Sequence, residues 1–173
     1  MCARESRDAF PARGHDHRAC VAGALGRAEA VCARRGAQLT PLRRRVLEYV
    51  WKSHAPVGAY DILDRLSAGG RRAAPITVYR ALDFLMANGL VHRLASRNAY
   101  VGCGLPGGPH EAQFLICNGC GTVTEVQDKR IERAIIAGAA GVGFASDTAL
   151  VEVRGLCPDC TGGGAGGDER SGK

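Results

Sequence analysis

The first half of the chain carries apolar stripes with helical spacing, separated by short breaks rich in Pro or Gly. Thr40-Pro41 has the form of a helix start, because a hydroxyl side chain can cap a helix and proline suits its first turn. Apolar residues then recur from Leu42 to Val50 at i, i+4, i+7 and i+8, which gives one buried face. Similar patterns predict helices over residues 20–35, 59–67 and 75–87, the last ended by Asn88-Gly89.

Strand-like segments follow the last of these helices. Residues 90–94 and 99–103 are predicted to form a hairpin that turns at Arg97-Asn98. The last three of these helices, followed by a β-hairpin, are the parts of a winged helix-turn-helix domain. The next segment, 104–109, contains two prolines and three glycines and is therefore predicted to be a hinge.

Beyond the hinge the pattern indicates a second, smaller α/β domain. Strands are expected over 113–116, 122–126 and 148–154, and a helix over 128–140 with Ile131 and Ile135 on one face. The fold class is therefore α+β. We expect a winged-helix domain over 19–103, a hinge over 104–110 and a second domain over 111–160, with residues 1–18 and 161–173 disordered.

Charge divides the chain in the same way. The 173 residues carry a net charge of +6, but residues 1–110 hold 17 Lys and Arg against 8 Asp and Glu, and residues 111–173 hold 6 against 9. A basic N-terminal half is typical of a surface that meets phosphates, although a solvated basic face would look the same. The first 30 residues lack a long apolar core and no stretch is long enough to cross a membrane, so we expect a cytoplasmic protein.

The clearest chemical signal is two Cys-X-X-Cys pairs, Cys117/Cys120 and Cys157/Cys160, separated by a predicted strand and helix. Four thiolates can close a tetrahedral zinc site, and a closed site is structural rather than catalytic. A disulfide or a redox pair is the alternative, but two such pairs in one small domain favour zinc.

A second set of possible ligands is more dispersed. A hairpin that turns at Arg97-Asn98 would place His92 directly opposite Cys103, within reach of one metal ion. His110 follows the hinge, and Glu125 lies on a strand of the second domain. These four residues would form a zinc site that bridges the two domains, although each alone would be an unremarkable strand or surface residue. The other cysteines, Cys2, Cys20 and Cys32, have no evident partner.

Several motifs together resemble the ferric uptake regulator family over residues 40–160. Residues 77–82 (Thr-Val-Tyr-Arg-Ala-Leu) with 88–91 (Asn-Gly-Leu-Val) resemble its recognition-helix motif, residues 60–63 its preceding helix, and the two Cys pairs its structural zinc site. Within the family the order of His92, Cys103, His110 and Glu125 is most similar to the sensing site of the zinc uptake regulator branch.

The resemblance implies a homodimeric repressor of metal-uptake genes that binds a DNA operator, expected to be an AT-rich palindrome, when zinc is bound. Two zinc ions per chain are expected. The His-rich cluster of the iron and peroxide sensors is missing, since residues 110–114 contain a single histidine. Cys103 as a soft ligand also favours zinc over iron(II) or manganese.

For DNA contacts the expected residues are Tyr60, Thr77, Tyr79 and Arg80. Arg80 is placed on the outer face of the recognition helix, where an arginine can contact guanine with two hydrogen bonds. Hydroxyl groups near the start of that helix can meet phosphates. The alternative for both tyrosines is a role in packing.

Three alternative functions fit the sequence to different degrees. A zinc deaminase would need His-X-Glu and Pro-Cys-X-X-Cys, whereas this chain has His110-Glu111 and places Leu156 before Cys157, so no enzyme is expected. A zinc-ribbon interaction module would explain the cysteines but not the winged-helix half. A member of the same family that senses iron, manganese or peroxide stays open.

Overall fold

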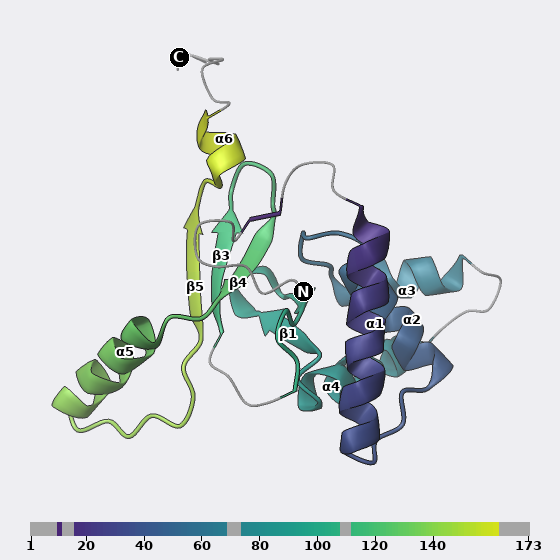
Figure 1. Cartoon of the computed structure of the whole chain (residues 1–173), viewed down its shortest axis with the longest axis horizontal. Coiled ribbons are helices and arrows are strands. Elements are labelled where there is room, and N and C mark those ends of the chain that lie inside the picture. The colour runs from purple at the N-terminus through teal and green to yellow at the C-terminus, as the bar shows by residue number, and fades with distance from the viewer. Residues whose placement is uncertain (1–9, 12–15, 69–73, 108–111, 163–173) are drawn as a thin grey trace.

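The computed structural model describes residues 10–11, 16–68, 74–107 and 112–162. A helical part with a short hairpin lies beside a three-stranded sheet, and one helix projects from the far side of that sheet (Figure 1). The helical part contains α1 (His17–Arg34), α2 (Pro41–Trp51), α3 (Ala59–Ser67), α4 (Pro75–Ala87), β1 (Val91–Leu94), the 3₁₀ turn η1 (Ala95–Arg97) and β2 (Ala99–Gly102). The second part contains β3 (Gln113–Cys117), β4 (Val123–Val126), α5 (Lys129–Gly141), β5 (Val151–Gly155) and α6 (Pro158–Gly162).

The helix ends in the first part are set by the residues that the sequence indicates. Thr40 caps α2, its hydroxyl accepting a hydrogen bond from the backbone N–H of Arg43 at 3.4 Å. Helix α4 ends before Gly89, which takes a left-handed φ of 65°. Helix α1 begins at His17, three residues before the expected start, because the side chain of Asp16 caps it. The apolar faces of the four helices meet in one core with Val91 and Tyr100 of the hairpin.

The pairing of β1 with β2, which form the wing, differs from the sequence prediction. Leu94 pairs with Ala99 and His92 with Val101, so His92 does not lie directly opposite Cys103. The predicted register is wrong because the turn is longer than expected: η1 and the left-handed Asn98 (φ 45°) together span four residues. The shift amounts to two residues, and side chains alternate with a period of two, so His92 and Cys103 still lie on the same face.

The second sheet has the order β4-β3-β5, with β4 antiparallel and β5 parallel to the central β3. The wing packs directly on this sheet. Leu94 and Val101 of the wing share an apolar cluster with Phe114, Ile116 and Val123 of the sheet. The two parts of the chain are therefore joined by a buried interface as well as by the covalent linker.

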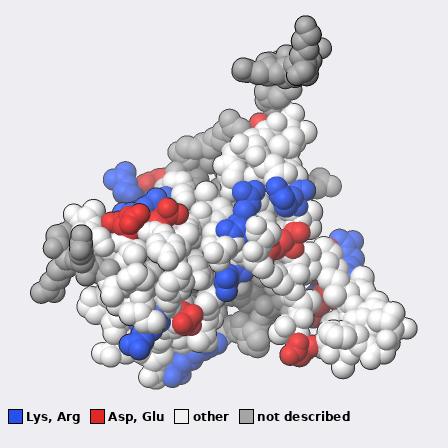
Figure 2. All heavy atoms as spheres, turned by 180° about the vertical axis from the view of Figure 1, so that it is seen from behind, with Lys and Arg blue, Asp and Glu red and all other residues white. Residues whose placement is uncertain are grey.

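Helix α5 has no buried residue and projects away from the sheet (Figure 1). Ile131, predicted to share one face of this helix with Ile135, is 38% exposed. The exposed apolar side chains continue into the next segment with Val142 and Phe144 at 83% and 65%. The lobe that α5 forms is mostly free of charged side chains on the face drawn in Figure 2. Among the described residues, no helix has the length and apolar character needed to cross a membrane.

Candidate metal centres and nucleic-acid interface

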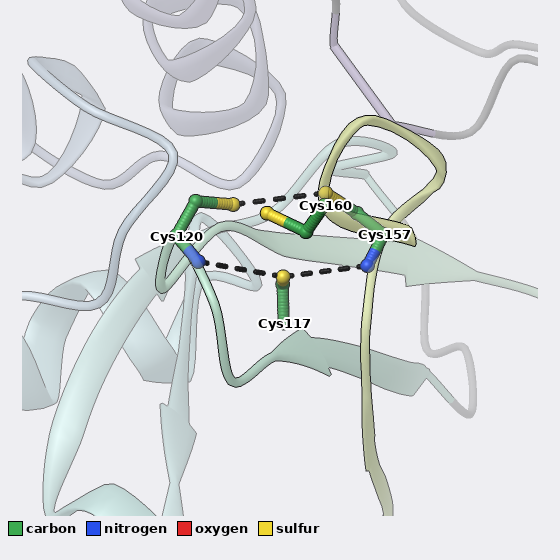
Figure 3. Close-up of side chains that lie close together, drawn as sticks. All are labelled: Cys117, Cys120, Cys157 and Cys160. Atoms are coloured by element: carbon green, nitrogen blue, oxygen red, sulfur yellow. Dashed lines mark hydrogen bonds between the residues drawn. The ribbon is translucent and has the colours of Figure 1, made fainter. Parts of the chain in front are cut away.

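The four cysteines of the two Cys-X-X-Cys pairs converge where β3 ends and α6 begins (Figure 3). Their sulfur atoms all lie within 4.8 Å of one another, and the Sγ atoms of Cys120 and Cys157 are 3.7 Å apart. A disulfide would bring two sulfurs to about 2.05 Å. Sulfurs bound to one tetrahedral zinc at about 2.3 Å lie about 3.8 Å from each other, so the observed spacing fits a metal site.

The local backbone makes this site compact. A Cβ atom on Gly119 would lie 2.9 Å from the Sγ of Cys160, so only glycine fits at that approach. Gly121 has a φ of 76°, which turns the chain back into β4.

Hydrogen bonds tune the thiols unequally. Backbone N–H groups of Cys120 and Cys157 point at the Sγ of Cys117, at 3.5 and 3.3 Å, and lower the pKa of that thiol to about 6. The pKa of the Cys160 thiol is raised, first by hydrogen bonding with Cys157 and second by burial. Four thiolates at this spacing repel one another, so full deprotonation requires a cation in the centre.

A second cluster lies where the wing meets the sheet. His92 on β1, Cys103 directly after β2 and Glu125 on β4 place their ligand atoms within 4.8 Å of one another. The Nε2 atom of His92 lies 3.6 Å from Oε1 of Glu125, whose other oxygen accepts a 2.8 Å hydrogen bond from the backbone N–H of Gly104. Three of the four predicted sensing residues thus come together, and the fourth, His110, lies outside the described residues.

This cluster is well shielded from solvent. Cys103 is 1% exposed, and burial, followed by the charge of Glu125, raises the pKa of its thiol to about 12. The His92 ring rests edge-on against the Phe114 ring, with centroids 5.2 Å apart. A soft thiol, an imidazole and a carboxylate held this close suit a divalent metal of the zinc type.

The predicted DNA-contacting residues lie on α3 and α4, which pack against each other as the two helices of a helix-turn-helix. Tyr60 is 67% exposed and Tyr79 37%, so neither is a buried packing residue. Arg80 is exposed as expected, and Thr77 is half-buried in the first turn of α4. Ile76, which the sequence did not single out, is also exposed beside them and could make apolar contacts with a base.

Among the described cysteines, Cys20 and Cys32 join neither cluster. Cys32 is buried in the helical core and Cys20 is half-buried on α1, while Cys2 lies outside the described residues. Burial raises the pKa of the Cys32 thiol, so it is kept as a neutral core residue.

A helix-turn-helix with a wing, joined to a sheet that carries two metal-type clusters, defines a metal-linked DNA-binding protein. The profile of the ferric uptake regulator family matches residues 34–154, and the chain belongs to this family. It is 42% identical over 137 residues to the zinc uptake regulation protein of Escherichia coli (strain K12), covering 79% of this chain and 80% of that protein. It is 30% identical over 105 residues to the zinc uptake regulation protein of Mycobacterium tuberculosis (strain CDC 1551 / Oshkosh), covering 59% and 78%.

Solved structures show the same similarity. A zinc uptake regulator complexed with zinc and DNA matches with a TM-score of 0.76 and 40% identity, covering 82% of this chain and 95% of that one. The holo form of the regulator XcZur matches with a TM-score of 0.73 and 42% identity, covering 80% and 96%. Each match extends over both parts of the chain, so the arrangement of the wing and the sheet is included in the similarity.

Proposed function

We propose that this chain is a zinc-responsive, DNA-binding transcriptional repressor of metal-uptake genes, acting in the cytoplasm as a homodimer. It is a transcription regulator of the ferric uptake regulator family and not an enzyme. The observation that carries the proposal is the cluster of His92, Cys103 and Glu125, whose members come from both the wing and the sheet. A ligand held there touches the part that meets DNA and the part that meets a second subunit.

Two zinc ions per chain have distinct roles in this proposal. Cys117, Cys120, Cys157 and Cys160 would hold one, and with four protein ligands it has no open position and supports the fold. His92, Cys103 and Glu125, completed by His110, would hold the other. Its positive charge offsets the Cys103 thiolate and the Glu125 carboxylate that share the buried site.

The residues that would contact DNA are Tyr60, Thr77, Tyr79 and Arg80, on the exposed side of α3 and α4. A dimer must present two such surfaces at one fixed spacing to bind a palindrome, for which an AT-rich sequence is proposed. The exposed apolar side chains of α5 and the segment after it support self-association of the second domain, because apolar side chains that gather on a protein surface often mark an interface.

The proposed domains are 19–103 and 111–160, with 104–110 as the linker. Because ligands to one ion lie on both sides of the linker, an occupied site restricts how the wing moves relative to the sheet. Only chains whose wing and sheet are arranged for DNA binding can bind the operator. The apparent DNA affinity of the metal-free protein is therefore its intrinsic affinity multiplied by the fraction of chains in that arrangement.

The test is to measure binding of the purified protein to AT-rich palindromic duplexes at controlled free concentrations of zinc, iron(II) or manganese(II). The metal content of the protein is determined on the same samples. We expect two zinc per chain at saturation and DNA binding that depends on zinc. Equal stimulation by iron(II) or manganese(II) at the same free concentration would contradict the choice of zinc.

A further inference from the structure

The carboxylate of Glu152, on β5, joins the sheet to the tip of the wing. It accepts hydrogen bonds from the backbone N–H of Ala95 at 2.7 Å and of Ser96 at 3.2 Å, and a third from the hydroxyl of Ser96. These residues are 56 and 57 positions away in the sequence. Two backbone N–H groups and one hydroxyl of the wing tip therefore donate to a single carboxylate of the sheet.

Glu152 and the metal-type cluster belong to one row of the sheet. Phe114 on the central strand pairs with Glu125 on one side and with Glu152 on the other. Paired residues of neighbouring strands project to the same face, so both carboxylates and the Phe114 ring face the wing. Two strand spacings separate the carboxylates by about 10 Å.

The wing runs along this row of residues and contacts it at both ends. His92 approaches Glu125 and Phe114, and Ala95, three residues further along the wing, approaches Glu152. Three residues of strand span about 10 Å, which equals the separation of the two carboxylates. Glu125 therefore holds the base of the wing and Glu152 holds its tip, and only the first of these contacts includes residues of the metal-type cluster.

We propose that Glu152 is a positioning residue that docks the wing without metal and thereby sets the zinc concentration at which DNA binding begins. This inference rests on the proposed function. The docked and undocked arrangements of the wing are in equilibrium in the metal-free chain, and Glu152 shifts that equilibrium toward the docked one. The sensing site is complete only when docked, so its apparent zinc affinity scales with the docked fraction.

Linkage fixes what loss of Glu152 can and cannot change. The docked fraction of the metal-free protein falls, and the apparent zinc affinity falls by the same factor. At saturating zinc the docked arrangement is already dominant, so DNA affinity there stays the same. A residue that contacts DNA, or that merely supports folding, would instead lower DNA affinity at every zinc concentration.

The experiment compares the full-length chain with Glu152→Gln and Asp147→Asn, titrating free zinc in a metal buffer while a palindromic duplex reports binding by fluorescence anisotropy. Asp147 is exposed in the segment before β5, so its variant matches the change in net charge without touching the wing. For Glu152→Gln we expect half-maximal DNA binding at roughly three- to tenfold higher free zinc, the range given by weakening one set of charge-assisted hydrogen bonds. Asp147→Asn should titrate like the unmodified chain.

Ser96→Ala provides a second, milder test, because it removes the hydroxyl contact and leaves both backbone contacts. Ser96→Ala should raise the free zinc needed for half-maximal DNA binding, but by less than Glu152→Gln does. In the double variant, Ser96→Ala should cause little further change, because its hydrogen-bond partner is already altered. An unshifted midpoint for Glu152→Gln, or a loss of DNA affinity at saturating zinc, would overturn the inference. Absence of zinc-dependent binding in the unmodified chain would instead overturn the proposed function.

Discussion

Gly102, the last residue of β2, allows the wing to lie against the only tryptophan of the chain. A Cβ atom at this position would lie 2.2 Å from both Cε2 and Nε1 of Trp51 and 2.7 Å from Cζ2. Carbon atoms in contact normally stay about 3.5–4.0 Å apart, so Gly102→Ala must displace the indole or the strand by about 1.3 Å or more. Trp51 is only 8% exposed, which leaves its ring little space to move.

Overpacking of this kind costs about 1–3 kcal/mol. For a chain of this size that corresponds to a decrease in Tm of about 2 to 12 °C. Because Cys103 directly follows Gly102, a displaced strand should also weaken zinc binding at the sensing cluster. Thermal unfolding at fixed free zinc measures the first effect, and a zinc titration in a metal buffer measures the second. The emission of Trp51 reports whether the indole is displaced.

Gly155→Ala is the matched control, since it also lies in a strand and a Cβ there would meet nothing within 4 Å. It should leave Tm and Trp51 emission nearly unchanged. If Gly102→Ala unfolded at the same temperature as the unmodified chain, with the same emission, the close packing of β2 on Trp51 would be refuted.

Three further predictions concern the other sites. Cys157→Ser should lose one zinc per chain and destabilise the second domain, because structural zinc contributes directly to folding; retention of full zinc and stability would show that this cysteine is not a ligand. Arg80→Ala should cost about 1–3 kcal/mol at one base-pair position of the operator, whereas an equal loss on all sequences would indicate a phosphate contact. Phe144→Ser should weaken self-association measured by sedimentation, because this ring is 65% exposed in the single chain and is free to pack on a second copy; an unchanged dimer would place the interface elsewhere.

The elements whose signals are local could be predicted from the sequence. Helix α3 has the predicted bounds, and α2 begins at Pro41 after Thr40, because caps and prolines act within one turn. The four-Cys cluster was also predictable, since each pair is held by its own short turn. That His92, Cys103 and Glu125 meet was predicted as well, but by a wing register that is off by two residues.

Features that depend on long-range packing were not visible in the sequence. A turn of four residues with a left-handed Asn98 has no strong local signal to separate it from a two-residue turn. The role of Glu152 depends on β5 adding in parallel beside β3, which puts a carboxylate of the second domain under the tip of the wing. The sequence pattern places the wing entirely in the first domain, yet Leu94 and Val101 belong to an apolar cluster shared with the sheet.

The central claim is that the cluster bridging wing and sheet couples zinc to DNA binding, and Cys103→Ser tests it most directly. The control is Cys20→Ser, the same chemical change at a half-buried cysteine that belongs to neither cluster. The measurement is operator affinity with and without free zinc, beside zinc content and oligomeric state. We predict that Cys103→Ser keeps its structural zinc and its dimer but loses the zinc-dependent gain in DNA affinity, while Cys20→Ser keeps all three. Full zinc-stimulated binding by Cys103→Ser would contradict the assignment of this cluster as the sensing site.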